Sequence, residues 1–268
     1  MSIIDILNID VIMSILDYLK DYDKMNFMMT CKEYYDLRSN INYTNLYEYD
    51  FIKKLPIINR FKRLVYQGQI PDTNVSVIKH IGEFLVKDLD KPIPDNITHL
   101  TFGYEFNQNI DGCIPNSVTH LTFRTHFNQN IKNCIPNSVT QLEFGLDFNQ
   151  NIKDCIPNSV TLSPEEQVRK KATPSRLTHL TFGYSFNKNI KECIPNSVTH
   201  LTFGYIFNKD IKDCIPNSVT RLTFGHNFNQ NIEDCIPTSV THLTFFKEYN
   251  KDIKLWIPNT VTYLLFRY

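Results

Sequence analysis

Apolar and polar positions along the C-terminal part of the chain recur with a period of 21 residues. Most units contain the pattern Val-x-x-Leu-x-Phe, then Phe-Asn, and then Cys-Ile-Pro before the pattern starts again. A fixed period of this length predicts a solenoid, in which each coil buries its apolar side against the neighbouring coils. The last residue of the first pattern stands at Phe102, Phe123, Phe144, Phe182, Phe203, Phe224, Phe245 and Phe266.

The pattern within one unit predicts a short strand with one buried and one outward face. Leu121 and Phe123 lie two residues apart and share one face, so His120 and Thr122 point to the other. The apolar residues that follow are spaced irregularly, which favours a turning return over a regular helix. Stacked coils place these strands side by side, so we predict an α + β fold in which helices precede a parallel-sheet solenoid.

Two polar or small residues keep a fixed place in the unit. A glycine follows the strand phenylalanine in most units, as at Gly103 and Gly145, and we expect it to accommodate a tight turn. An asparagine side chain carries both a donor and an acceptor, so a column of them predicts a ladder of hydrogen bonds to the backbone of adjacent coils. This column comprises Asn107, Asn128, Asn149, Asn187, Asn208, Asn229 and Asn250.

The N-terminal residues follow a helical spacing instead. A helical stripe of apolar residues predicts an amphipathic helix, and a second helical segment follows an acid-rich break at residues 21–23. We predict a helical domain at residues 1–40, a bridging segment of degenerate repeats at 41–91 with strands near 63–66 and 84–89, and the repeat solenoid at 92–268. The stripe consists of Val11, Ile12, Ile15, Leu16 and Leu19.

An insertion of 17 residues near 162–178 interrupts the repeat. It is either a loop that leaves the stack or a decayed coil within it. We favour the decayed coil, because a loop has to return the chain to the same register.

Composition restricts the class of partner. Lysine plus arginine and aspartate plus glutamate both number 28, so the formal net charge is zero, and no basic field is available to attract nucleic acid. No apolar run reaches the roughly 18 residues of a membrane-spanning helix. The N-terminus has no basic segment of the kind that begins a signal peptide. We expect an intracellular, most simply a cytoplasmic, protein with no nucleic-acid or membrane partner.

Six of the seven cysteines occupy one repeat position, which suggests either a metal or disulfide framework or a column of buried thiols. Trp256 takes the same position in the last unit, and a packing position tolerates that change where a ligand position does not. We therefore expect reduced, buried thiols and no metal. The column comprises Cys113, Cys134, Cys155, Cys193, Cys214 and Cys235.

Histidines dominate one outward strand position and raise the question of a metal site. Neighbours in this column are about 4.8 Å apart on a flat sheet face, and nothing completes a tetrahedral shell, so a solvated column is favoured. No catalytic motif occurs in the sequence, and we expect neither an enzyme nor a cofactor. The column is His99, His120, Gln141, His179, His200, Arg221, His242 and Tyr263.

Departures from the repeat pattern on the outward positions indicate a candidate target-binding surface. They concentrate in two successive units, and tyrosines line the edge beside them, as in many protein-binding patches. Neutral drift on a solvated face remains the alternative interpretation. The candidate residues are Tyr104, Arg124, Gln141, Glu143, Leu146, Tyr184 and Tyr205.

The recurring Phe-Asn and Ile-Pro pairs, as in Phe127-Asn128 and Ile135-Pro136, resemble the FNIP repeat. This family is known mainly from social amoebae and from large DNA viruses that infect amoebae. The resemblance covers residues 92–268 and implies leucine-rich-repeat-like coils that serve as interaction modules, with no catalytic residue.

The N-terminus resembles an F-box, a motif that commonly precedes FNIP repeats. Leu7 and the hydrophobic stripe match the start of the motif, and Cys31-Lys32 match its later helix, but Asn8 replaces the usual proline. The resemblance implies binding of the small F-box-binding adaptor of cullin ubiquitin ligases. By resemblance, the adaptor-binding residues are Leu7, Val11, Ile12, Ile15, Leu16, Leu19, Cys31 and Lys32.

Two functions follow from these resemblances. The chain is expected to be a substrate-recruiting F-box subunit of a cullin-type, SCF-like ubiquitin ligase, which holds the adaptor through its N-terminal helices and an unidentified target protein through its solenoid. The alternative is a non-catalytic scaffold whose helices only cap the solenoid.

Overall fold

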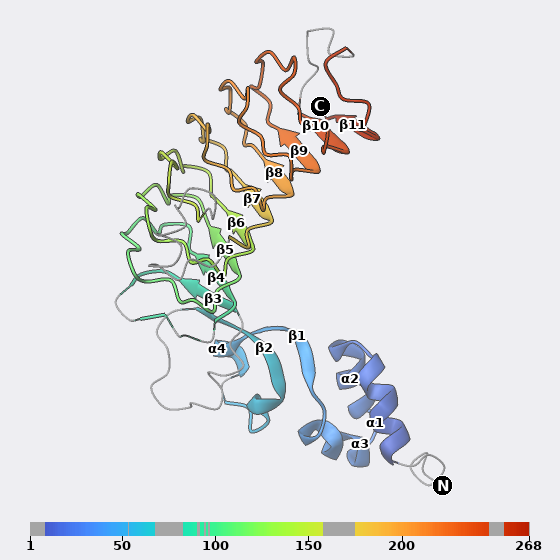
Figure 1. The fold of residues 1–268 in the computed structure, drawn as a ribbon. Coiled ribbons are helices and arrows are strands. Elements are labelled where there is room, and N and C mark those ends of the chain that lie inside the picture. The colour runs from blue at the N-terminus through green and yellow to red at the C-terminus, as the bar shows by residue number, and fades with distance from the viewer. Residues whose placement is uncertain are drawn as a thin grey trace, which may run out of the picture. The chain divides into compact units, whose positions relative to one another are not determined.

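The computed structural model describes residues 9–52, 54–67, 83–89, 92–93, 95, 97–157, 175–246 and 255–267. The chain divides into two compact units, Met1–Leu85 and Val86–Tyr268, and each is considered by itself below. The predicted helical segment and most of the predicted bridge therefore belong to one compact unit. Figure 1 shows the helices and first strands in blue and the repeat array from green to red.

The N-terminal unit begins with helices and continues with parallel strands. Strands β1, β2 and β3 lie in that order, with neighbours parallel. Strands β2 and β3 confirm the strands predicted near 63–66 and 84–89, whereas β1 was not predicted. The elements are α1 (Ile9–Tyr18), α2 (Asp21–Met28), α3 (Lys32–Asp36), a 3-10 turn (Leu37–Ser39), β1 (Tyr43–Glu48), α4 (Tyr49–Ile52), a second 3-10 turn (Ile58–Arg60), β2 (Phe61–Gln67) and β3 (Glu83–Val86).

A buried ion pair joins α2 to β1. Asp21 and Lys24 are 0% and 2% exposed, and the Asp21 Oδ1 lies 3.4 Å from the Lys24 Nζ. The Asp21 Oδ2 accepts hydrogen bonds from the Asn45 backbone N–H at 2.7 Å and from the Tyr47 hydroxyl at 3.1 Å. Lys24 Nζ also donates to the Asn42 carbonyl at 3.0 Å. Burial and the Asp21 charge together raise the pKa of Tyr47, so the phenol stays a donor.

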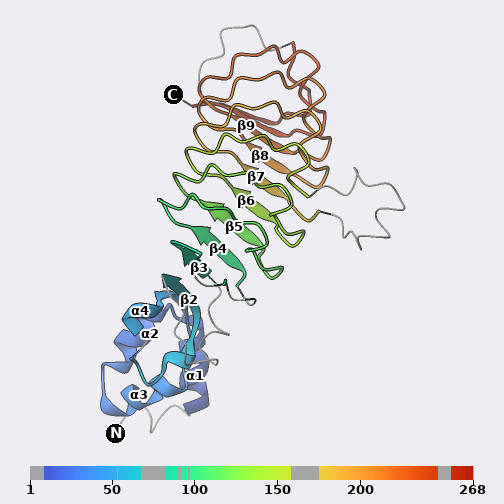
Figure 2. The ribbon, with the colours of Figure 1, turned by 90° about the vertical axis from the view of Figure 1, so that its left-hand side faces the viewer.

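The C-terminal unit is the predicted parallel-sheet solenoid. Its strands pair in chain order and in register, one strand for each coil, and the returns between them consist of turns. Figures 1 and 2 show the strands side by side along one side of the array and the returns along the other. The strands are β4 (His99–Phe102), β5 (His120–Phe123), β6 (Gln141–Glu143), β7 (His179–Thr181), β8 (His200–Thr202), β9 (Arg221–Phe224), β10 (His242–Phe245) and β11 (Tyr263–Phe266).

Two columns of phenylalanine rings form the centre of the array. Rings at the strand position follow one another at centroid distances of 5.0–5.7 Å, as between Phe102 and Phe123. Rings at the Phe-Asn position follow at 6.1–6.2 Å, and the two columns approach to about 4 Å within a coil, as at Phe123 and Phe127. Aromatic pairs at such distances add about 0.5–1.5 kcal/mol to the burial of each ring.

Polar ladders run along the array beside this core. The Asn128 backbone N–H donates to the Asn107 Oδ1 at 2.9 Å, and the bond recurs between later coils up to Asn229. This confirms the asparagine ladder through the acceptor atom of each amide, and Asn250 lies outside the described residues. A second ladder was not predicted. In it a threonine hydroxyl donates to the threonine carbonyl one coil earlier, as from Thr119 to Thr98 at 3.2 Å.

The residue before each column cysteine adopts a left-handed backbone. The φ angle there lies between 54° and 67°, a region that glycine, asparagine and aspartate tolerate best. Glu192 is the least suited occupant of this position. The position is filled by Gly112, Asn133, Asp154, Glu192, Asp213 and Asp234.

The preference for a decayed coil at 162–178 is wrong, because no strand lies between β6 and β7. These strands pair directly, with Gln141 opposite His179. The two ladders cross the same gap, since Asn187 N–H donates to Asn149 Oδ1 and the Thr178 hydroxyl donates to the Thr140 carbonyl. Residues 158–174 lie outside the described residues. The strands on either side of the insertion are therefore direct neighbours in the sheet.

The glycines after the strand begin the predicted tight turn, as where the Phe207 N–H donates to the Gly204 carbonyl at 3.4 Å. Most of them also meet a steric limit that was not predicted. A Cβ built on Gly204 would lie 1.8 Å from the carbonyl oxygen of Gly183, and Gly145, Gly183 and Gly225 meet the same obstacle. Consecutive coils thus approach each other backbone to backbone at this column. Glycine is required there by lack of space and not by an unusual φ angle.

None of the helices among the described residues reaches the length and apolarity needed to cross a bilayer.

We expect Gly204→Ala to destabilise the array strongly, because its methyl group would collide with backbone that cannot rotate away. The loss should exceed the ~1–3 kcal/mol of ordinary overpacking. Gly112→Ala is the matched control, since its Cβ meets nothing within 4 Å and costs only the ~1–2 kcal/mol of a left-handed backbone. Urea midpoints of the two variants provide the measurement. Equal midpoints would contradict the close approach.

We expect Asp21→Asn to destabilise the N-terminal unit by about 3–5 kcal/mol, because it leaves the buried Lys24 ammonium without a countercharge. Asp23→Asn changes an exposed carboxylate on the same helix and should alter stability by no more than about 0.5 kcal/mol. Thermal unfolding of the N-terminal unit, followed by tyrosine absorbance, compares them. A small effect of Asp21→Asn would show that the ion pair does not hold α2 to β1.

Candidate interaction surfaces

Helix α1 has an inward and an outward apolar side. Ile12 and Leu16 are 2% and 1% exposed and belong to the core of the N-terminal unit. Val11 and Ile15 are 44% and 48% exposed and lie one turn apart on the opposite side. The prediction that all four residues contact a partner is therefore wrong for Ile12 and Leu16. The two pairs overlap in sequence, so the apolar pattern alone looks like one wide stripe.

Further exposed apolar residues extend this outward side, and sequence reasoning missed them. Tyr18 follows Val11 and Ile15 at helical spacing, and Tyr22, Met25 and Met29 follow the same spacing on α2 and its C-terminal end. Their spacing of three, four and seven residues was the available signal. We call Val11, Ile15, Tyr18, Tyr22, Met25 and Met29 the helical face.

The remaining residues of the predicted adaptor site differ in position. Leu19 is half-buried, and Lys32 is exposed in the first turn of α3. Cys31 is half-buried at the N-cap of α3. Leu7 and Asn8 lie outside the described residues.

The outward strand positions of the array form a regular polar face. Histidine rings stack in pairs, His99 on His120 at 4.0 Å and His179 on His200 at 4.1 Å. The ring nitrogen Nδ1 of each lies within about 3 Å of the hydroxyl of the preceding threonine, as between Thr199 and His200. The histidine column is thus tied to the threonine ladder.

This arrangement decides which nitrogen each neutral histidine protonates. The Thr199 hydroxyl donates its one hydrogen to the Thr178 carbonyl, so toward His200 it accepts a hydrogen bond from the Nδ1–H. Nε2 is then the unprotonated nitrogen of the neutral ring. Burial lowers the pKa of His200, and the neighbouring His179, Arg221 and His242 lower it further.

Parallel rings are poorly arranged for a metal, because their Nε2 lone pairs do not converge on one point. Within the described ranges, no group of three or more His, Cys, Asp or Glu residues is placed to hold a metal ion.

Exposed side chains line the edge of the sheet just beyond the strands. Tyr184 stacks on Tyr205 at 4.9 Å, and Tyr205 stacks on His226 at 4.8 Å. Two strands earlier, the Arg124 guanidinium lies over the Tyr104 ring at 4.6 Å. Cation–π and aromatic contacts of this kind hold the side chains in place before any partner arrives.

The edge beside β4, β5 and β6 carries acidic groups as well. His126 donates from Nδ1 to the Asp147 carboxylate at 2.7 Å, and its Nε2 lies 3.7 Å from the Glu105 carboxylate. The hydrogen bond to Asp147 and the charge of Glu105 raise the pKa of His126. Glu143 is exposed on β6 nearby.

The predicted target-binding residues thus fall into two groups on one face of the array. One group lies over β4 to β6, where acidic and basic side chains mix, and comprises Tyr104, Arg124, Gln141, Glu143 and Leu146. The other is the stacked pair Tyr184 and Tyr205, after β7 and β8. All but Arg124 are exposed, and Arg124 is half-buried.

The cysteine column is buried, as predicted. Five of the six column thiols are buried, Cys113 in the first unit is half-buried, and all are free. Each buried thiol donates to backbone carbonyls of its own turn, as Cys134 does to Lys132 at 3.3 Å. Burial raises the pKa of Cys134 and Cys193 to about 11, so these thiols stay protonated at neutral pH.

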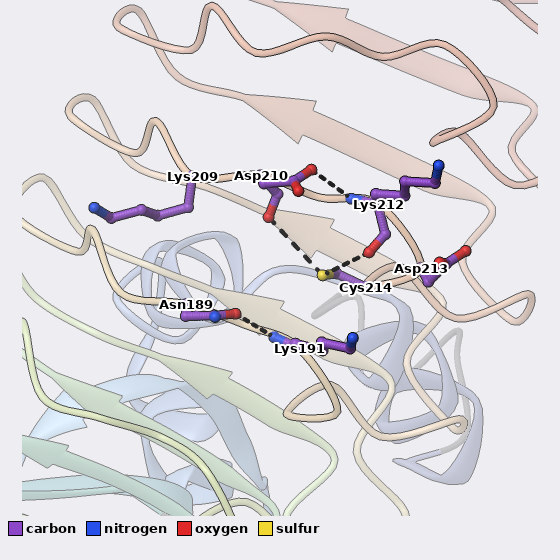
Figure 3. A pocket seen from close by; sticks show the side chains of 7 residues that line it. All are labelled: Asn189, Lys191, Lys209, Asp210, Lys212, Asp213 and Cys214. Atoms are coloured by element: carbon purple, nitrogen blue, oxygen red, sulfur yellow. Dashed lines mark hydrogen bonds between the residues drawn. The ribbon is translucent and has the colours of Figure 1, made fainter.

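A hollow of about 320 Å³ lies among the returns of coils β7 and β8, lined by Asn189, Lys191, Lys209, Asp210, Lys212, Asp213 and Cys214. Figure 3 shows that the Lys209 and Lys212 side chains extend in opposite directions. The Asp210 carboxylate accepts a hydrogen bond from the Lys212 backbone N–H, and this bond closes the turn. The lysines do not converge, and the lining mixes both charges.

The repeats match the FNIP Repeat family at residues 87–126, 127–162, 171–206, 186–227, 207–247 and 228–268. The chain belongs to the FNIP-repeat family. A relative from Acanthamoeba polyphaga mimivirus named as an F-box and FNIP repeat-containing protein is 34% identical over 110 residues, 41% of this chain and 36% of the relative. Another, named as an F-box protein of the same virus, is 39% identical over 72 residues, 27% of this chain and 26% of that protein.

A solved structure supports the fold. The crystal structure of CroV588, a circular LRR protein, matches with a TM-score of 0.56 and 38% identity over 77% of this chain and 34% of that chain. This FNIP-repeat chain therefore spans only about a third of the length of these relatives. Its array is a solenoid of the leucine-rich-repeat kind, the architecture of interaction scaffolds.

We expect the column thiols to resist modification in the native protein. At pH 8 a thiol-specific chromogenic reagent should react rapidly with at most two cysteines, Cys31 and Cys113, because the other five are buried and their pKa values are raised. All seven should react in denaturant. Stoichiometric zinc in the purified protein, measured by elemental analysis, would contradict the packing role.

Proposed function

We propose that this FNIP-repeat protein recruits a target protein to a cullin-type ubiquitin ligase. The helical face binds the small F-box-binding adaptor, and the strand face of the array binds the target. Catalysis belongs to other subunits, and this chain contributes proximity, which raises the effective concentration of target lysines at the conjugating enzyme.

The observation that carries the proposal is the unburied apolar side of α1 and α2. Val11, Ile15 and Tyr18 lie exposed on the helix whose sequence resembles the start of an F-box, and the names of the mimivirus relatives support that resemblance. An exposed row of large apolar side chains at helical spacing is typical of a protein-binding face. A helix that only capped the array would not require it.

The array supports the target-binding half of the proposal. Its core columns are held by packing and its ladders by hydrogen bonds, so selectivity rests on outward positions. Those positions include the preorganised Arg124–Tyr104 and Tyr184–Tyr205 pairs. Preorganised aromatic and arginine side chains lose little conformational entropy on binding.

A pair of neighbouring substitutions tests adaptor binding. Ile15→Glu adds a charge to the exposed side and should abolish binding of the purified adaptor in isothermal titration, with the unfolding temperature unchanged. Leu16→Ala opens a cavity in the core and should lower the free energy of unfolding by about 2–5 kcal/mol, with the helical face intact.

Leu146→Glu on the array is the matched surface control and should leave adaptor binding unaltered. If Ile15→Glu binds the adaptor as well as the unaltered chain does, the helical face is not the adaptor site and the helices serve as a cap.

A further inference from the structure

The outward face of strands β7 to β10 differs in charge from that of β6, where Glu143 is exposed. Among the described residues, none of its outward positions is acidic. Each offers a hydroxyl, an imidazole or a guanidinium, and Arg221 supplies a permanent positive charge. These positions are His179, Thr181, His200, Thr202, Arg221, Thr223, His242 and Thr244.

The edge beside these strands adds ring edges and a phenol hydroxyl from each tyrosine. Tyr184, Tyr205 and His226 stack on one another, so each ring face between them is already covered. What the stack offers a partner is the positive edge of each ring and the hydroxyls. Both features suit a ligand rich in hydrogen-bond acceptors.

Strand β6 and the sheet edge beside β4 to β6 provide a more acidic environment. Glu143 is exposed on the strand face, and Glu105 and Asp147 flank His126 at the edge. An acidic ligand is repelled there and attracted toward β7 to β10. Two regions of the same sheet therefore differ in the charge that they present to a ligand.

We propose that the face of β7 to β10, with the stacked edge of Tyr184, Tyr205 and His226, binds an extended acidic segment of the recruited protein. Four strands at about 4.8 Å spacing span about 14 Å, the length of four or five residues of extended peptide. The proposal rests on the proposed function only for the statement that the partner is recruited. The binding itself needs no adaptor.

Protons are taken up when such a segment binds. When it is neutral, the His200 ring presents an unprotonated Nε2, which cannot donate to a carboxylate. In the free chain, burial and the positive charge of Arg221 lower the pKa of His200 and favour this neutral form, and no described acidic group on the face opposes them. A bound carboxylate favours the charged form instead, so affinity rises as pH falls from about 7.5 to 6, where glutamate stays ionised.

A nucleic acid also carries negative charge, but it fits this face less well. Single strands bind largely by stacking bases on free aromatic faces, and the faces within this stack are covered by each other. The stack therefore favours carboxylates of a protein segment over an oligonucleotide.

Fluorescence anisotropy with the full chain tests the proposal, using a labelled oligoglutamate peptide at low salt. Oligoglutamate should bind, and oligoglutamine of the same length should not. Arg221→Glu should weaken binding about tenfold, because it removes an attraction and adds a repulsion. Lys132→Glu, which reverses the charge of an exposed lysine on the return after β5, should change affinity less than about twofold.

His200→Gln should keep the affinity at pH 7.5 and flatten its rise toward pH 6. Equal loss in both charge-reversal variants, tighter binding of oligouridylate than of oligoglutamate, or absence of oligoglutamate binding overturns the proposal. Adaptor binding of the same preparations is measured separately. If the adaptor fails to bind while oligoglutamate binds, the ligase role is wrong and the acidic-segment site stands.

Discussion

Each coil of the array buries its apolar side chains only against the coil before it and the coil after it. A single coil has too few contacts to close a core, so strand register, ring stacking and ladders all depend on this neighbour-to-neighbour burial. The phenylalanine columns show the consequence most directly. Phe123 contacts Phe102 and Phe144 in adjacent coils, and its in-coil partner Phe127 does the same with Phe106 and Phe148.

The same dependence explains why polar groups recur as regularly as apolar ones. Backbone donors at the turns of one coil face the next coil, and the Asn107 side chain accepts from the following turn at Asn128. A buried donor without a partner costs about 1–3 kcal/mol, so a ladder residue cannot be lost cheaply. Freedom to vary is thereby confined to the outward strand positions and the sheet edge, where Arg124 and Glu143 depart from the repeat pattern.

Repetition made much of the array predictable. The residue patterns that predict the strand faces, the asparagine ladder and the burial of the cysteines each recur in several units. Each of these predictions therefore rests on several examples of the same environment. The tight turn at the glycine column was predicted, but recurrence does not show which atom of the previous coil excludes a side chain there. The insertion was misjudged because sequence length alone cannot distinguish a coil from a loop between β6 and β7.

The N-terminal unit is not repeated, so each of its positions occurs only once in the sequence. Adjacent apolar pairs on α1 fit either side of the helix, and only the packed structure shows that Leu16 points inward and Ile15 outward. Asp21 and Lys24 have the spacing of an ordinary exposed helix pair, yet β1 covers them. The helical face was therefore identified from burial, and the sequence offered two guides to it, the helical spacing and the F-box resemblance.

Because β6 pairs directly with β7, the number of residues in the chain does not determine the length of the array. Residues added between two strands of the stack do not move those strands apart, whereas one additional coil advances every later strand by about 4.8 Å. Distances between side chains on the strand face therefore change only in whole coils. From Tyr104 to Tyr205 the interval is four strand spacings, about 19 Å, whatever number of residues the chain inserts between them.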